Sequence, residues 1–243
     1  MAIQYPKLRL YRFPGSCSLL SHMVLRHLGI PFDETVMRYA AGGGFEAADG
    51  SMDAAAYKSQ VNMSGQVPAL AVREAGDDNG FVITQNIAIT SYVIELAQQA
   101  GNPAAAVLNG EPGSLLSRIR VLQWLSYLAS TVHYIGFAPG IRPDGFADDK
   151  SVHDNLAYKG RQQLVRAFER FEKELGSDFA VNNALTTVDF YLYVLWRWTK
   201  MPMFDGLIPG EYPRFEGLAR NVEKLPSVQE TLEAEGLQRI FSE

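Results

Sequence analysis

The sequence has a single cysteine, Cys17, among its 243 residues. One thiol cannot form a disulfide within its own chain, a CxxC redox pair or a cysteine-rich zinc site. Charge of one sign is not in strong excess either, because 22 lysines and arginines against 27 aspartates and glutamates give a net charge of −5. This mild acidity argues against broad contact with nucleic acid or with an anionic membrane.

Long hydrophobic runs are scarce. The best candidate for a membrane span is Val121–Ile141, which contains no acidic or basic residue. Polar residues, a glycine and a proline interrupt it, so we interpret it as a buried amphipathic helix that breaks near its end. Together with the unpaired cysteine, this predicts a cytoplasmic protein that makes no membrane contact. The four histidines show no metal-ligand spacing, and we therefore expect no metal site.

The first hundred residues alternate between short β-type runs and helical runs. Lys7–Arg12 has the alternation of a strand, and Ser16–Leu28 has apolar residues at helical spacing. Phe32–Arg38 indicates a second strand. Pro68–Arg73 and Phe81–Thr84 are typical of a hairpin, with a turn at residues 74–80, and a helix follows from Asn86. The order is βαβ followed by ββα, which predicts a small α/β domain at residues 1–100.

Two segments of this part lack strong periodicity. Ala40–Ala56 is rich in glycine and alanine, and we interpret it as a long surface loop with at most one helical turn. Residues 101–113 carry proline, glycine and asparagine at both ends and are expected to be a linker. Beyond the linker the β signals stop. Residues 114–243 are predicted to form an all-helical domain with helices over 114–137, 152–175, 188–200, 212–223 and 226–235.

Cys17 lies between the first strand and the first helix, within Pro14–Ser18. Free N–H groups and the positive dipole end of a helix favour an anion there, and a thiol ionises more readily at such a place. Cys17 is therefore a candidate nucleophile or thiolate partner, although a small buried apolar role fits equally well. Ser16 is a plausible hydroxyl donor beside it, or simply a helix cap.

Two further places in the N-terminal part could bind a ligand. If the peptide bond between Val67 and Pro68 were cis, the backbone N–H and C=O of Val67 would face outward and could pair with an extended peptide. Gln85 and Asn86 stand at the start of a helix, where a side-chain amide and free N–H groups can hold a carboxylate. The alternative for Asn86 is an ordinary N-cap, and this is the more common role.

Two groups of polar residues stand out in the helical part. Ser126, Ser130 and His133 are spaced four and three apart, which predicts one polar face on an apolar helix and suggests a cleft wall. For His133 alone, a hydrogen-bonded core histidine is the more common role. Thr186 and Asp189 match a capping box, for which we expect a structural role. Loss of this cap in Asp189→Ala would cost about 1 kcal/mol or more.

Three segments in order resemble the cytosolic glutathione transferases, and among them the bacterial beta class. These segments are FPGSCSLLSHMVLRHLG from Phe13, WLSYLASTVH from Trp124 and LTTVDFYLYVLWRW from Leu185. The resemblance extends over nearly the whole chain. It implies a thioredoxin-like N-terminal domain that binds glutathione and an all-α C-terminal domain with a pocket for a hydrophobic electrophile. It also implies a homodimer.

The resemblance assigns roles to individual residues. Cys17 matches the cysteine next to the glutathione sulfur, with Ser16 beside it, and His133 matches a histidine that reaches into the same cleft. Val67, before the family's cis proline at Pro68, would hold the cysteinyl backbone of glutathione. The γ-glutamyl end would contact Gln85 and Asn86, where the beta class more often has an acid followed by glycine or serine. Ser126 and Ser130 match polar positions of the cleft. We also expect an apolar cavity between Phe13, Tyr134, Phe137 and Trp196–Trp198.

Three functions are compatible with this resemblance. The first is conjugation of the glutathione thiolate to a hydrophobic electrophile, which serves detoxification. The second is glutathione-dependent thiol–disulfide exchange through a mixed disulfide at Cys17, in which a second glutathione must act because no resolving cysteine is present. The third is a non-catalytic glutathione-binding protein. A fold alone does not decide among them.

Overall fold

The computed structural model describes residues 5–74, 80–206, 208 and 210–241. The chain divides into two compact units. The first unit comprises the described residues up to Ala106 together with Leu225–Arg239, so the last helix of the chain belongs to the N-terminal unit. The second unit comprises Val107–Lys224 and the residues from Ile240. The predicted combination of a mixed α/β part and a helical part is confirmed.

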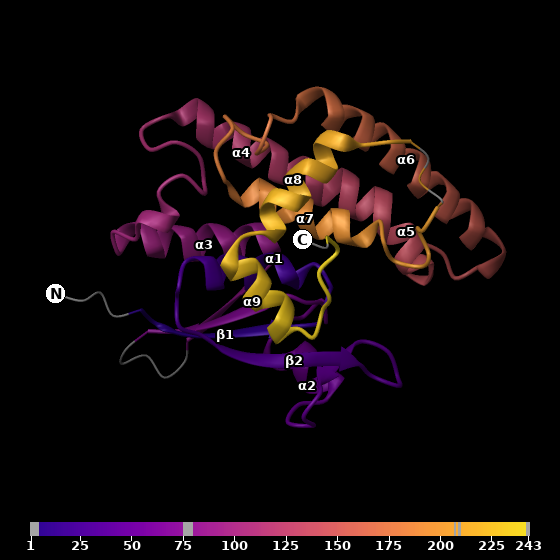
Figure 1. Ribbon diagram of the computed structural model, residues 1–243. Coiled ribbons are helices and arrows are strands. Elements are labelled where there is room, and N and C mark those ends of the chain that lie inside the picture. The colour runs from indigo at the N-terminus through magenta and orange to yellow at the C-terminus, as the bar shows by residue number, and fades with distance from the viewer. Residues whose placement is uncertain (1–4, 75–79, 207, 209, 242–243) are drawn as a thin grey trace. The chain divides into compact units, whose positions relative to one another are not determined.

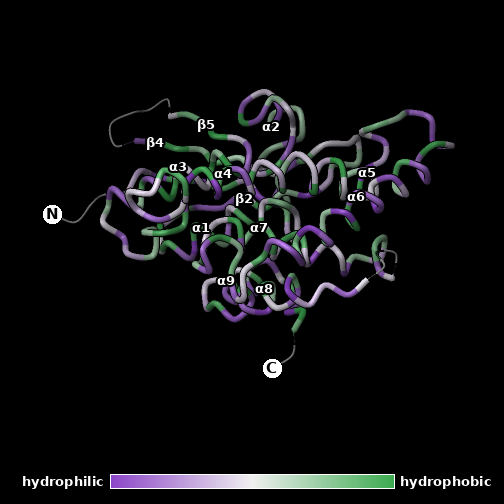
Figure 2. Tube along the Cα trace, turned by 90° about the horizontal axis from the view of Figure 1, so that it is seen from above, coloured by the Kyte–Doolittle hydropathy of each residue, from purple (hydrophilic) through white to green (hydrophobic). Residues whose placement is uncertain are grey.

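The first unit is built on a five-stranded sheet with the strand order β3-β2-β1-β4-β5. The strands are β1 (Lys7–Arg12), β2 (Asp33–Tyr39), β3 (Phe45–Ala47), β4 (Ala69–Arg73) and β5 (Phe81–Thr84). β1 and β2 are parallel, as a βαβ crossover requires, and the remaining pairs are antiparallel. The β4–β5 hairpin is confirmed, whereas residues 75–79 of its predicted turn lie outside the described residues. Hydrophobic residues predominate along β4, a central strand (Figure 2).

Helices cover both faces of this sheet. They are α1 (Ser18–His27), α2 (Ala54–Gln60), α3 (Asn86–Gln99), the short η1 (Pro103–Ala105) and α9 (Pro226–Ala234). Helices α1, α3 and α9 lie on one face, and α2 lies on the other (Figure 1). The side chains of Leu19, Leu20 and Met23 on α1 are fully buried, which agrees with the helical spacing of its apolar residues.

The prediction of one long surface loop at Ala40–Ala56 is wrong in part. Phe45–Ala47 pairs with Met37–Tyr39 of β2 and adds an edge strand to the sheet, and α2 begins at Ala54. A three-residue strand next to glycines is too short to give a period-2 signal. Its aromatic residue has a clear packing role, because the Phe45 ring stacks on Tyr39 at 4.7 Å and lies 5.4 Å from Phe13.

The second unit is helical. Its α-helices are α4 (Leu115–Tyr127), α5 (Ala138–Ile141), α6 (His153–Glu174), α7 (Thr187–Trp198) and α8 (Pro213–Glu223), with short 3₁₀ turns η3 (Pro143–Gly145) and η4 (Lys150–Val152). Helix α7 is buried along nearly its whole length and forms the centre of the unit. Aromatic rings from α6, α7 and α8 pack edge to face around it, as in the contact of Trp196 with Phe215 at 4.9 Å.

Helix α4 continues directly into a π-helix, η2 (Leu128–Phe137). Such wide helices are rare and often occur at functional sites. The π-helix lies very close to α6, because a Cβ atom at Gly160 would approach the carbonyl oxygen of Gly136 to 2.4 Å. Glycines at these two positions therefore permit the backbone contact that supports the π-helical segment. Among the described residues, no helix has both the length and the apolar character needed to cross a membrane.

Candidate active site

Cys17 is the N-cap residue of α1, at the end of a tight turn that starts at Phe13. The turn closes with a hydrogen bond from the Ser16 N–H to the Phe13 carbonyl at 3.2 Å, and Gly15 supplies the positive φ of +69° that it needs. The half-buried Cys17 thiol thus stands beside the N-terminal end of a helix, which favours a thiolate. The Ser16 hydroxyl accepts from the Ser18 N–H at 3.2 Å and lies 2.8 Å from the Ser18 hydroxyl.

The structure brings Cys17 and Val67 together. The Cys17 thiol donates to the Val67 carbonyl oxygen, with a distance of 3.4 Å from Sγ to oxygen, and the Val67–Pro68 peptide bond is cis. Two side chains that the sequence interpretation missed hold the residue before Val67. The Tyr57 hydroxyl and the Asn62 amide both donate to the Gln66 carbonyl, at 2.8 and 2.6 Å. Burial raises the pKa of Tyr57, so its hydroxyl remains a donor at neutral pH.

Asn86 has a different role from the cap that the sequence suggests. The N-cap residue of α3 is Gln85, and the Asn86 side chain points to α1 instead. Its amide nitrogen donates to the Cys17 carbonyl at 3.0 Å, and its amide oxygen accepts from the Ser21 hydroxyl at 2.7 Å. The Cys17 carbonyl and the Ser21 hydroxyl satisfy both ends of the Asn86 amide, which outweighs a local cap. Asn86 therefore fixes the backbone of Cys17.

Gln85 is exposed and has a φ of +72°, in the left-handed region that non-glycine residues rarely adopt. Such backbone strain is of order 1–3 kcal/mol and is concentrated at binding sites. Cys17, Val67, Gln85 and Asn86 thus lie on connected turns of the first unit, beside the N-termini of α1 and α3. Two helix N-termini and a strained, exposed amide form an arrangement suited to a ligand that carries carboxylates.

His133 lies in the π-helix of the second unit. Its Nδ1 atom is 2.9 Å from the Tyr191 hydroxyl of α7, and the Trp198 ring contacts it edge to face at 4.8 Å. Burial, and to a smaller extent the positive charge of Arg142, lowers the pKa of His133 to about 4. The imidazole is therefore neutral at physiological pH. It can donate or accept a hydrogen bond, but it does not supply a positive charge.

The predicted polar face of Ser126, Ser130 and His133 is not that of a regular α-helix. Ser126 lies in α4, whereas Ser130 lies in the π-helix. The Ser130 hydroxyl donates to the Ser126 carbonyl at 2.8 Å. Both serines are exposed, whereas His133 is half-buried against α7. Because a π-helix turns less per residue than an α-helix, positions three and four apart no longer lie on one face. The spacing argument fails at this change of winding.

The expected apolar cavity also needs correction. Phe137, Trp196 and Trp198 are buried in the core of the second unit, with at most 5% of their surface exposed. The Phe137 ring packs between Trp198 and Phe204, at 5.4 and 5.0 Å. Phe137 and Trp198 are therefore core residues, whereas Trp196 borders a pocket that is also lined by Phe168, Phe204 and Tyr212. Tyr134, in contrast, is half exposed and contacts Phe146 at 5.3 Å.

The low pKa of His133 gives a pH prediction. The folded-state pKa is about 4 and the unfolded value 6.5, so the folded state binds fewer protons between these values and its stability falls as the pH falls through this window. We expect this group to remove about 2 kcal/mol from the free energy of unfolding between pH 8 and pH 5. Urea unfolding of the wild type and His133→Asn at both pH values measures it. An equal loss of stability in both proteins would contradict the assignment.

Comparisons with known proteins agree with this architecture. Residues 146–235 match the family model described as glutathione S-transferase, C-terminal domain. The chain is 28% identical to the glutathione S-transferase GstA of Escherichia coli O157:H7 over 239 residues, which cover 95% of this chain and 100% of that protein. It is 27% identical to the glutathione S-transferase GST-4.5 of Xanthomonas campestris pv. campestris, with the same coverage.

Solved structures give the same result. A glutathione S-transferase from Xylella fastidiosa superimposes with a TM-score of 0.72 at 28% identity, and a sphingomonad glutathione S-transferase complexed with glutathione has a TM-score of 0.70 at 29% identity. A beta-class enzyme from Sphingomonas chungbukensis has a TM-score of 0.71 at 26% identity. Each comparison covers 95% of this chain and 100% of the other.

Proposed function

Because this chain belongs to the cytosolic glutathione transferase family, we propose that it transfers glutathione to a hydrophobic electrophile. The observation that carries the proposal is the contact of the Cys17 thiol with the Val67 carbonyl, beside a cis proline and at the N-terminus of α1. The N-terminus of α1, the Cys17 thiol and the backbone of Val67 thereby meet at one place. A cysteine-containing peptide bound there would pair with the Val67 backbone, and the helix terminus would stabilise the thiolate of the peptide. The role in detoxification and a cytoplasmic location are part of the same proposal.

Each half of the chain has a part in this proposal. Residues 1–100 hold glutathione, residues 101–113 link the two halves, and residues 114–243 form the pocket for the electrophile. Val67 pairs with the cysteinyl backbone, while Gln85 and Asn86 face the γ-glutamyl end with its ammonium and carboxylate. Cys17 and Ser16 stand beside the sulfur. We assign Ser126, Ser130 and His133 to the electrophile side.

The chemistry that these groups perform is the activation of a thiol. Glutathione is a weak nucleophile at neutral pH until its thiol ionises. Backbone N–H groups at the start of α1, with the Ser16 hydroxyl, stabilise the thiolate electrostatically and do not need to accept the proton. The neutral imidazole of His133 adds no charge of its own to the electrophile side, which suits an apolar substrate.

A homodimer is also proposed. Helix α4 presents exposed apolar side chains at helical spacing, with Leu115 71%, Ile119 50% and Leu122 49% exposed. Phe81 and Val82 of the edge strand β5 are also exposed, on opposite faces of the sheet. Exposed apolar groups at helical spacing, as on α4, are typical of surfaces covered by another subunit.

Titration calorimetry with glutathione tests the proposed site. The wild type should bind glutathione, and Gln85→Ala should bind about tenfold more weakly, because one hydrogen bond to a charged group is worth about 1.5 kcal/mol. Gln99→Ala is the matched control, since Gln99 is an exposed glutamine at the other end of the same helix. It should bind like the wild type. Absence of heat with the wild-type protein would exclude the transferase and the binder alike.

A further inference from the structure

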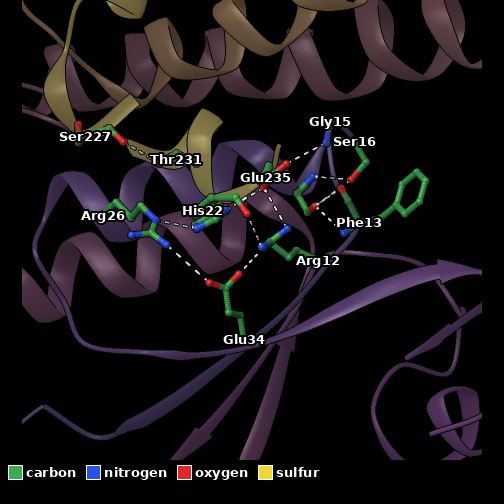
Figure 3. Close-up of polar contacts among 12 residues, drawn as sticks. Arg12, Phe13, Gly15, Ser16, His22, Arg26, Glu34, Ser227, Thr231 and Glu235 are labelled. Carbon is green, nitrogen blue, oxygen red and sulfur yellow. Dashed lines mark hydrogen bonds and ion pairs between the residues drawn. The ribbon is translucent and has the colours of Figure 1, made fainter. Parts of the chain in front are cut away.

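Glu235 is a fully buried carboxylate directly after α9, some 220 positions from the turn that precedes Cys17. Its Oε2 atom accepts from the Gly15 N–H at 2.8 Å. Figure 3 shows the carboxylate pointing from the end of α9 toward the turn that contains Gly15 and Ser16. A buried charged acceptor on a backbone N–H forms a strong hydrogen bond, and it fixes the turn at the residue with positive φ.

A second set of contacts fixes Glu235 itself. Its Oε1 atom is 2.7 Å from Nδ1 of His22, whose Nε2 atom accepts from Nε of Arg26 at 2.8 Å. Because Nε2 is an acceptor, the neutral ring carries its proton on Nδ1 and donates it to Glu235. The orientation of the carboxylate is thereby determined by α1, the same helix that Cys17 caps.

The charges around Glu235 are balanced. The Arg12 guanidinium of β1 lies 3.8 Å from Glu235 and donates through Nε to Glu34 of β2, which also pairs with Arg26 at 3.6 Å. Two arginines therefore face two carboxylates, with His22 between them (Figure 3). Such a balance permits a carboxylate to remain charged inside the unit, where a single charge would be expelled or neutralised.

Helix α9 is held in place by contacts along its length. The Ala234 carbonyl accepts from Nη2 of Arg12 at 3.3 Å, and the Ser227 hydroxyl lies 3.2 Å from Nδ1 of His27 on α1. The position of Glu235 thus depends on contacts with β1 and α1. The turn before Cys17 is anchored from both sides, by Glu235 at Gly15 and by Asn86 at the Cys17 carbonyl.

We infer that Glu235 is a positioning residue for the Cys17 turn, which acts by holding the Gly15 N–H so that the Cys17 thiol stays at the N-terminal end of α1. The inference deepens the proposed function, because the same turn would present Ser16 and Cys17 to the glutathione sulfur. It assigns a part in the active site to the C-terminal end of the chain. Glu235 does not touch the reacting sulfur.

The pH profile of thiol alkylation tests this inference in the unliganded protein. Since Cys17 is the single cysteine, alkylation by iodoacetamide reports on it alone. In Glu235→Ala the midpoint of the profile should rise by about one pH unit, because the thiolate loses part of its helix-dipole stabilisation. The rate at pH 7 should fall only about fourfold, since a thiolate of higher pKa is intrinsically more reactive.

Two variants separate anchoring from other effects. Glu235→Gln keeps a carbonyl oxygen for the Gly15 N–H, so its midpoint should stay near that of the wild type even if its melting temperature falls. Glu233→Ala removes an exposed glutamate two residues earlier and should change neither quantity. If Glu235→Ala lowers the melting temperature but leaves the alkylation profile unchanged, Glu235 is only structural and the inference is wrong. An equal upward shift in Glu235→Gln would also contradict it.

A measurement on the wild type covers the case in which Glu235→Ala does not fold. The Gly15 amide proton, bound to a buried carboxylate, should exchange with solvent at least about a hundredfold more slowly than in an open turn. Rapid exchange of the Gly15 amide proton would contradict the inference that Glu235 holds this turn. Neither the alkylation nor the amide-exchange experiment uses glutathione. A failure of the proposed function would therefore appear in the calorimetric titration with glutathione and would leave these two results unchanged.

Discussion

Asp189→Ala is expected to lower the free energy of unfolding by about 3–5 kcal/mol. The Asp189 carboxylate is completely buried and accepts from the N–H groups of Ala180 and Thr186, each at 2.7 Å, and from the Thr186 hydroxyl at 3.0 Å. Alanine leaves all three donors buried without this acceptor, and each such donor costs about 1–3 kcal/mol. The sequence alone predicts a loss of about 1 kcal/mol or more through the lost cap.

Urea unfolding at pH 7 measures this difference. Asp148→Ala is the control, because Asp148 is an exposed aspartate of the same unit, and its loss should change stability by less than about 0.5 kcal/mol. If the two variants were equally stable, Asp189 would contribute nothing beyond a surface cap. The capping box itself is present as predicted, and it positions the start of the central helix α7.

Burial also raises the pKa of Asp189 to about 6, although its three hydrogen bonds act in the opposite direction. The folded state therefore binds a proton more readily than the unfolded state, and this contribution to stability is lost as the pH rises through 6. His133 has the opposite dependence, because its folded-state pKa lies below the unfolded value. The two contributions partly cancel in the wild type, so single variants are needed to resolve either of them.

Cys17→Ala is expected to abolish thiol–disulfide exchange, with a loss of at least about a hundredfold, and to keep conjugation within about tenfold of the wild type. In exchange, the Cys17 thiolate attacks the glutathione sulfur of a mixed disulfide between glutathione and another thiol; Cys17 becomes disulfide-bonded to glutathione, and the other thiol leaves as its thiolate. A second glutathione then attacks the mixed disulfide, which restores Cys17 and releases oxidised glutathione. Conjugation needs only a stabilised glutathione thiolate, which the N-terminal end of α1 still provides.

Parallel assays on one preparation decide between these roles. Conjugation of a chlorinated aromatic and reduction of a glutathione mixed disulfide are compared for the wild type, Cys17→Ala and Cys17→Ser. The serine variant retains a hydroxyl donor and should conjugate at least as well as the alanine variant. Loss of both activities in Cys17→Ala would mean that the thiol itself activates glutathione. No change in either activity would remove Cys17 from the site.

Much of the fold follows from periodicity and stop signals. Gly29 and Pro31 mark the end of α1, and the apolar spacing of α6 and α8 predicts their bounds to within one or two residues. The missing element, β3, has three residues and lies among glycines, so no pattern could form. The π-helix was missed because apolar residues in a buried segment fit several windings, and the choice depends on the backbone contact between Gly136 and Gly160.

The site was predictable only where residues act locally. Cys17 follows from its place before a helix, and the strand end at Val67 follows from the proline beside it. Asn86 is not the N-cap that the local pattern also allows, and its contact with the Cys17 carbonyl, 69 positions away, could not be predicted from the sequence. The contact of Glu235 with Gly15 joins parts of the chain that only the fold brings together. Local patterns contain no information on such pairs.

The central claim is that the turn at Cys17 and the strand end at Val67 bind glutathione. A structure of the wild-type protein with glutathione bound tests it most directly. The claim predicts that the cysteinyl backbone of glutathione pairs with Val67 and that its sulfur lies in contact with Cys17 or Ser16. A glutathione molecule bound elsewhere, with no contact to Val67 and its sulfur remote from α1, would contradict it.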